Sequence, residues 1–239
     1  MKFSSCKKFL LDTFFPQFCL SCGKEGEAIC TDCFSLIEIS EYLFCPFCKK
    51  PQRVLEKGTC PTHRKNALNG LFAAVSYETP LVQTLIKNFK YEPFLKILAK
   101  PLASLIVAHF LLSKKWEIFY PLEKSLIVPV SLAGFRKRWR GFNQAEEIAK
   151  ILSDFFRTAL ISNNLVKIKT TQSQTELKEK QREKNIKGAF KVKFPEIFKN
   201  KKVFIVDDVF TTGATMEEAA KVLKQAGAKQ VWGIVMARE

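Results

Sequence analysis

The chain lacks a hydrophobic run long enough to cross a bilayer. Its most apolar stretch, residues 94–112, is interrupted by Lys96, Lys100, Pro101 and His109. Charged residues are costly inside a membrane, and proline interrupts a helix. The stretch therefore predicts a buried helix, kinked at Pro101, and no membrane span.

The first residues also lack the features of a secretory signal. Residues 1–15 begin with basic side chains, but their apolar block is short and is broken by Asp12. No cleavage site of the small-x-small kind follows. We therefore expect a cytoplasmic location, and we interpret residues 1–18 as a short amphipathic helix.

Acidic residues are scarce: 23 Asp and Glu stand against 39 Lys and Arg, which gives a net charge of +16. Such a surface attracts polyanions such as nucleic acid, anionic lipid or polyphosphorylated small molecules. It is equally compatible with a basic surface that serves only solubility. The apolar content of 47% excludes a disordered chain, and 239 residues can hold one α/β domain and a small module.

Cysteine is almost confined to one segment, where four Cys-x₂-Cys or Cys-x₂-His pairs follow one another. Their members are Cys19, Cys22, Cys30, Cys33, Cys45, Cys48, Cys60 and His63. Eight ligands are enough for two structural, four-coordinate zinc ions. Pairing in chain order and an interleaved pairing both remain open. Disulfides would need an oxidising compartment, and a thioredoxin-like site needs one Cys-x-x-Cys beside a βαβ unit.

After the cysteines, predicted strands alternate with predicted helices. The expected strands are 72–78, 125–130, 203–206 and 231–236. Three helices are expected: one opens at Thr79-Pro80, and the others span 141–156 and 214–226. Alternation of this kind predicts an α/β fold with a parallel sheet flanked by helices. We therefore divide the chain into an N-terminal helix (1–18), a double zinc-knuckle module (19–66) and an α/β domain (71–239).

The segment 203–215, VFIVDDVFTTGAT, carries the strongest functional signal. Asp207 and Asp208 follow a buried strand, and a Thr/Gly turn then leads into a helix. Backbone N–H groups at a helix N-terminus suit a phosphate. Carboxylates suit ribose hydroxyls, directly or through waters on Mg²⁺. An ordinary turn with threonine caps would explain the threonines but not two acids at a strand end.

This segment resembles the phosphoribosyl-pyrophosphate (PRPP) motif of type I phosphoribosyltransferases. The resemblance implies that Asp207 and Asp208 are catalytic, facing the ribose hydroxyls of PRPP bound with Mg²⁺. It also implies that the turn wraps the 5-phosphate. The ligand-binding positions that it implies are Val209, Thr211, Thr212, Gly213, Ala214 and Thr215.

A second strand end carries the sequence V-P-V and then GFRKRWRGFNQ. Taken alone, these residues fit a solvated basic loop and a helix cap as well as a site. The zinc knuckles, V-P-V, R-G-F-N-Q and VDDVFTTGAT in this order resemble the ComF family, competence-associated proteins with a role in uptake of transforming DNA. The resemblance implies that Pro129, Val130 and catalytic Arg140 lie near the pyrophosphate.

The resemblance continues through residues 167–187, which match the mobile loop that closes over the site in type I enzymes. The family often has Arg where this chain has Lys169. Lysine keeps the charge but loses the bidentate geometry of a guanidinium. The fourth knuckle ends in His63 instead of Cys, which still ligates zinc.

Three functional hypotheses follow. The first is a phosphoribosyltransferase-like protein that binds PRPP with Mg²⁺, or ribose 5-phosphate, with an unidentified acceptor. The second is a single-stranded DNA-binding factor that uses Arg136, Arg138 and Arg140, with Trp139 and Phe142 as stacking surfaces. The third is an adaptor for proteins of the competence machinery with a vestigial site. The intact acidic pair favours a working ligand site over a vestigial one.

Overall fold

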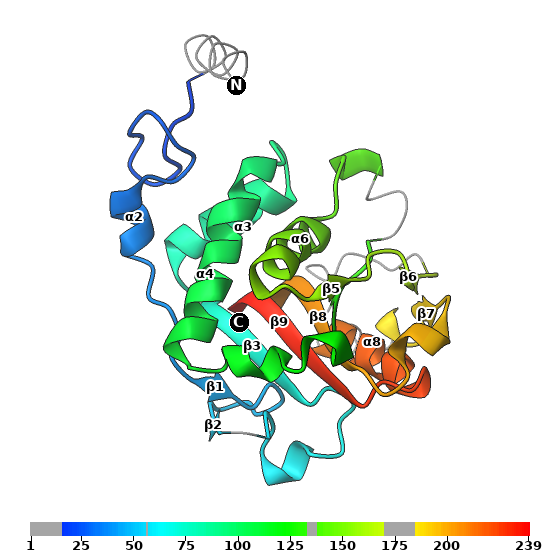
Figure 1. Cartoon of the computed structure of the whole chain (residues 1–239). Coiled ribbons are helices and arrows are strands. Elements are labelled where there is room, and N and C mark those ends of the chain that lie inside the picture. The colour runs from blue at the N-terminus through cyan, green and yellow to red at the C-terminus, as the bar shows by residue number, and fades with distance from the viewer. Residues whose placement is uncertain (1–15, 56, 133–137, 170–184) are drawn as a thin grey trace.

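A computed structural model describes residues 16–55, 57–132, 138–169 and 185–239 (Figure 1). The predicted helix 1–18 lies almost wholly outside these residues. Arg136 and most of the predicted mobile loop, including Thr171, Gln174 and Leu177, also lie outside them.

Five parallel strands form the central sheet in the order β3-β9-β8-β4-β5. The strands are β3 (Gly70–Ser76), β4 (Ser125–Pro129), β5 (Ala159–Leu160), β8 (Lys202–Phe210) and β9 (Gln230–Arg238). Nearly continuous burial along β4, β8 and β9 explains their apolar sequences, because both faces of a parallel sheet are covered.

Helices cover both faces of this sheet, as the α/β pattern predicts. They are α3 (Pro80–Lys90), α4 (Ala99–Leu112), α6 (Gln144–Phe156) and α8 (Ala214–Gln225). Phe204 and Val206 of β8 belong to the core cluster shared with α3, α4 and α6. Val203 and Ile205, which point to the other face, pack with α8. Figure 1 shows the resulting three layers.

Two predicted boundaries change for local reasons. Helix α6 begins at Gln144, not at residue 141, because Gly141 has a φ of +77° and Asn143 is extended at the N-cap. Helix α4 begins at Ala99, so Pro101 lies in its first turn, where a missing N–H costs no helical hydrogen bond. The predicted kink at Pro101 is therefore wrong.

Smaller elements complete the chain. The cysteine-rich segment contains α2 (Thr31–Ser35) and an antiparallel pair, β1 (Leu43–Phe44) and β2 (Arg53–Val54). A second antiparallel pair, β6 (Leu165–Lys167) and β7 (Phe190–Val192), brackets the predicted mobile loop. Short 3₁₀ turns join the rest. Within the described residues, no helix combines the length and the apolar character that a membrane crossing requires.

Candidate functional site: a carboxylate pair beside a phosphate-type loop

The two acids lie where β8 outruns its neighbour. Pairing of β4 with β8 ends at Pro129 and Val206, and the Val130 N–H then donates to Val206 O at 2.8 Å. Strand β8 continues to Phe210 with β9 on its other side only. Asp207 and Asp208 therefore stand at the carboxyl end of the sheet, beyond the end of β4. The sequence predicts the acids there, although the strand itself is longer than predicted.

Backbone and side-chain hydrogen bonds fix both carboxylates. Asp207 Oδ1 accepts from the Asp208 N–H at 2.9 Å, and Asp208 Oδ1 accepts from the Val209 N–H at 2.7 Å. Lys90, the last residue of α3, places Nζ 3.0 Å from each carboxylate oxygen of Asp208. A cation thus already sits on one member of the pair.

The charges at this strand end perturb one another. Burial and the neighbouring charge of Asp208 raise the pKa of Asp207 to about 7, against the opposing effect of Lys90. Burial lowers the pKa of Lys90, but the charges of Asp208 and Asp207 outweigh burial and leave it above its ordinary value. Two carboxylates in one desolvated site need a cation or hydroxyl groups between them, as a sugar bound with a metal ion would supply.

Residues Thr211–Thr215, here called the phosphate loop, join β8 to α8. Gly213 has a φ of +78°, and a Cβ there would lie 2.4 Å from the Phe210 ring, so only glycine fits. Gly213 is the N-cap of α8 and has no side chain, so it makes no side-chain cap hydrogen bond. Thr212 Oγ1 accepts from the Ala214 N–H at 3.4 Å.

The R-G-F-N-Q segment reaches the same end of the sheet. Arg140 is buried and donates to Gln144 Oε1 at 3.2 Å, and Gln144 donates to Phe89 O at 3.0 Å. Asn143 Nδ2 donates to Val130 O at 3.0 Å. Gln144 therefore joins Arg140 to the end of α3, one residue before Lys90.

The structure thus gathers most of the predicted site at one edge. Pro129 and Val130 are buried at the end of β4, and Val209 and the phosphate loop are half-buried, except for buried Gly213. Lys90 is the residue that sequence reasoning undervalued. Nothing in the sequence distinguishes it from Lys87 in the same helix end, and its partner proves to be the carboxylate of Asp208.

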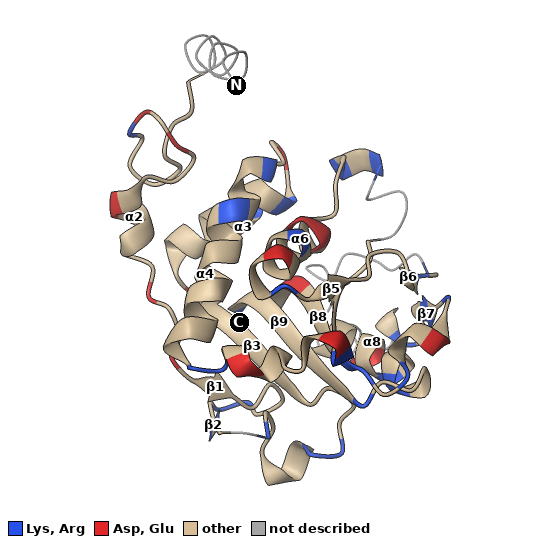
Figure 2. Ribbon diagram, viewed as in Figure 1, with Lys and Arg blue, Asp and Glu red and all other residues tan. Residues whose placement is uncertain are grey.

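The aromatic residues beside Arg140 divide between core and surface. Phe142 is buried and packs on Phe89 with ring centroids 5.6 Å apart, so it offers no stacking surface to a nucleic acid. Trp139 is 61% exposed and meets Phe94 edge-on at 5.2 Å. Figure 2 shows Lys and Arg on α3 and around β7.

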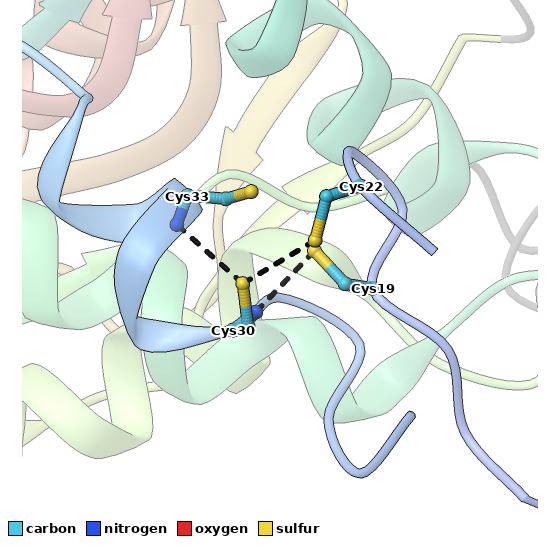
Figure 3. A group of neighbouring side chains, drawn as sticks. All are labelled: Cys19, Cys22, Cys30 and Cys33. Atoms are coloured by element: carbon cyan, nitrogen blue, oxygen red, sulfur yellow. Dashed lines mark hydrogen bonds between the residues drawn. The ribbon is translucent and has the colours of Figure 1, made fainter. Parts of the chain in front are cut away.

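The first cysteine set closes into one cluster. Figure 3 shows the side chains of Cys19, Cys22, Cys30 and Cys33 turned toward one another, and their sulfurs all lie within 4.8 Å of one another. The Cys22 and Cys30 sulfurs are 3.6 Å apart. A tetrahedral zinc ion with Zn–S bonds of about 2.3 Å holds its sulfurs about 3.8 Å apart, so the set fits zinc.

The second set is Cys45, Cys48, Cys60 and His63, so the pairing is in chain order and the interleaved alternative is wrong. His63 presents Nδ1, which lies 3.1 Å from the Cys60 sulfur. Without an ion, burial and the neighbouring thiols raise the pKa of Cys48 to about 12. The pKa of Cys60 falls to about 6, because its hydrogen bonds outweigh burial. Crowded thiols of this kind suit a cation that replaces their protons.

Two family models match different parts of the chain. The model for the phosphoribosyl transferase domain matches residues 118–238, and the model for the double zinc ribbon domain matches residues 10–63. The parallel sheet with its acidic strand end is thus a phosphoribosyltransferase-like fold, and the two cysteine sets form a zinc-ribbon module in front of it, as predicted.

Known proteins are similar to this chain over about two thirds or more of its length. Competence protein F of Haemophilus influenzae is 30% identical over 240 residues, covering 94% of this chain and 99% of its own. The DNA utilization protein YhgH of Salmonella typhimurium is 31% identical, covering 66% and 69%. Competence protein ComFC of Bacillus subtilis is 25% identical, covering 85% and 81%. The chain therefore belongs to the ComF family.

Proposed function

We propose that this protein binds PRPP with Mg²⁺, or a related ribose 5-phosphate, at the carboxyl end of β8. One observation carries the proposal: a pair of carboxylates, Asp208 buried and Asp207 half-buried, stands beyond the end of β4, and five residues after Asp208 the helix α8 begins at an N-cap glycine, which has no capping side chain. The first feature recognises ribose hydroxyls and a metal, and the second recognises a phosphate. Calorimetric titration of Mg²⁺ and PRPP into the protein tests the proposal.

Each group has a distinct task in this proposal. Asp207 and Asp208 orient the ribose, and the phosphate loop holds the 5-phosphate through backbone N–H groups. Arg140, fixed through Gln144, supplies positive charge toward the pyrophosphate. Bound Mg²⁺ would neutralise the leaving pyrophosphate. Transfer to an acceptor would also need the acceptor to be held in place and water to be excluded.

The names of the relatives, a competence protein and a DNA utilization protein, support a proposal for the cellular role. We propose a cytoplasmic, competence-associated role in the use of incoming DNA, with two zinc ions held structurally by the module 19–66 and sugar-phosphate chemistry confined to 71–239. Inclusion of β3 in the second domain agrees with its pairing to β9 across the sheet.

Ionisation of Asp207 should make the stability of the free protein depend on pH. Because its pKa is raised to about 7, the ionised carboxylate is disfavoured in the folded state. Stability contributed at this position is therefore present at low pH and is lost as pH rises toward 7. Asp207→Asn should raise the melting temperature by a few degrees more at about pH 8 than at about pH 5.5. Thermal unfolding without ligand measures this, and an equal gain at both pH values would contradict it.

Direct binding of single-stranded DNA is a second candidate, favoured by the exposed ring of Trp139 between Arg138 and Arg140. Stacking on one ring and contact with phosphates predict that Trp139→Ala weakens binding about tenfold. Affinity should also fall steeply with salt. Fluorescence anisotropy measures both, with Trp116→Ala, another exposed tryptophan, as the matched control. An equal loss of DNA affinity in both variants would show that Trp139 is not part of a specific DNA-binding site.

A further inference from the structure

The second zinc site is hydrogen-bonded to the strand that flanks the candidate site. Arg238, the last residue of β9, donates to the carbonyls of Cys45 at 3.2 Å, Pro46 at 3.5 Å and Cys48 at 3.2 Å. These carbonyls belong to the knuckle that supplies two of the four ligands. One guanidinium thus holds the whole turn.

Charge supports the same contact. Three thiolates, a neutral histidine and Zn²⁺ together carry one negative charge, which a guanidinium complements. Arginine can span several carbonyls because its donors form a planar fork.

Arg238 also lies next to the phosphate loop. Its register partner in the sheet is Phe210, the last residue of β8, and the following N–H, of Glu239, donates to Phe210 O at 3.0 Å. The Phe210 ring lies directly under Gly213. A shift of Arg238 would therefore move the floor of the phosphate loop.

A second tether acts from the other side of that loop. Glu217, in the first turn of α8, accepts from the N–H groups of Ala67 at 2.9 Å and Leu68 at 3.0 Å, one on each carboxylate oxygen. These residues follow His63 closely in the chain, and Leu68 is fully buried. The segment between His63 and β3 is thus bonded to the first turn of α8, whose N-terminus would bind the phosphate.

Packing makes the second zinc site part of the α/β core. Gly58 lies so close to Trp232 of β9 that a Cβ would stand 2.4 Å from the ring. Phe47 contacts the His63 ring, with centroids 5.7 Å apart, and packs against the core cluster on the α8 face. The module therefore cannot loosen at this site without disturbing β9 and α8.

The first zinc site has different neighbours. Among the described residues, the hydrogen bonds of residues 17–37 stay within that segment. Its buried members pack with the cluster of α3 and α4, on the face opposite α8.

We infer that the second zinc site is a positioning element for the phosphate loop, acting through Arg238 and Glu217. Zinc at Cys45, Cys48, Cys60 and His63 and a sugar phosphate at the loop then favour each other's binding, while the first zinc site is neutral. This inference rests on the proposed function for the identity of the ligand. The hydrogen bonds of Arg238 and Glu217 do not depend on that function.

The decisive variant is Glu217→Gln, which keeps the shape but turns one accepting oxygen into a donor that faces a backbone N–H. We expect affinity for Mg²⁺ and PRPP to fall about tenfold, within the usual range of coupling between sites. With no ligand present, amide hydrogen exchange at residues 209–216 should be faster in Glu217→Gln than in the parent protein. Glu218→Gln is the matched control, because it removes the same charge from the same helix turn. The Glu218 carboxylate accepts from the Gly188 N–H and not from Ala67 or Leu68.

Reciprocity supplies an independent readout. Saturating Mg²⁺ and PRPP should slow extraction of the second zinc by a chelator, and Arg238→Met should abolish this protection. Cys22→Ser, which empties the first site only, should retain it. Zinc is counted by mass spectrometry of the intact protein, with circular dichroism to confirm that the variants are folded.

The two proposals fail in distinguishable ways. If the parent protein gives no binding signal with Mg²⁺ and PRPP, the proposed function is wrong. Amide hydrogen exchange at residues 209–216, compared between Glu217→Gln and the parent, still tests whether Glu217 holds the phosphate loop. If the parent binds and Glu217→Gln keeps both parental affinity and parental exchange, the positioning role is wrong. Loss of affinity in Glu218→Gln equal to that in Glu217→Gln would also overturn it, because charge alone would then explain the effect.

Discussion

Replacing Asp207 and Asp208 together by Asn is expected to reduce the affinity for Mg²⁺ and PRPP by roughly 100-fold or more. The amides keep the size of the side chains but cannot carry the charge that a metal and ribose hydroxyls require. Asp208 is buried and Asp207 is half-buried, and a charge–ligand contact at such a position is worth more than one at the open surface. Calorimetry of parent and variant measures the loss.

The fold of this variant should survive. The Asp208 carboxylate is bonded to the Lys90 ammonium, which is partly exposed. Replacing the carboxylate removes the partner of this one lysine and changes no residue of either core cluster. Asp154→Asn, on the exposed side of α6, is the matched control and should bind as the parent does. Parental affinity in the double variant, with unchanged circular dichroism, would refute the role of the acids.

Much of the fold follows from local sequence. A parallel strand buried on both faces must be apolar throughout, so β4, β8 and β9 are visible as runs. Turn chemistry marks Pro80 as the first residue of α3. Strands of two or three residues, such as β5 and β6, carry too little pattern to be predicted.

The acidic pair and the zinc ligands were equally visible, because their chemistry lies in residues close together in the chain. Long-range contacts were not. Lys90 meets Asp208 across 118 positions, and Arg238 meets Cys45 across 193. Nothing near Lys90 distinguishes it from Lys87 until the end of α3 is placed over β8. The same limit applies to Glu217, which appears in sequence as an ordinary acid in a helix's first turn.

Purified without added metal, the protein is expected to hold two zinc ions, and their removal should lower its melting temperature by roughly 10 °C or more. The cysteine-rich segment has little regular structure of its own. Its strands β1 and β2 have two residues each, its helix α2 has five, and only a few apolar side chains, Ile29, Ile37 and Leu43 among them, are buried. A module so small needs the metal for its folding free energy.

The loss should be local before it is global. The sheet has its own core between α4, α6 and α8, so chelation should expose the cysteine-rich segment while β4 and the first half of β8 stay protected from hydrogen exchange. The end of β9 should follow the module, because Arg238 and Trp232 lose their partners with the second zinc. Mass spectrometry gives the zinc count, and exchange gives the map. Zinc near zero with oxidised cysteines, or identical melting with and without chelator, would show that these clusters do not depend on metal.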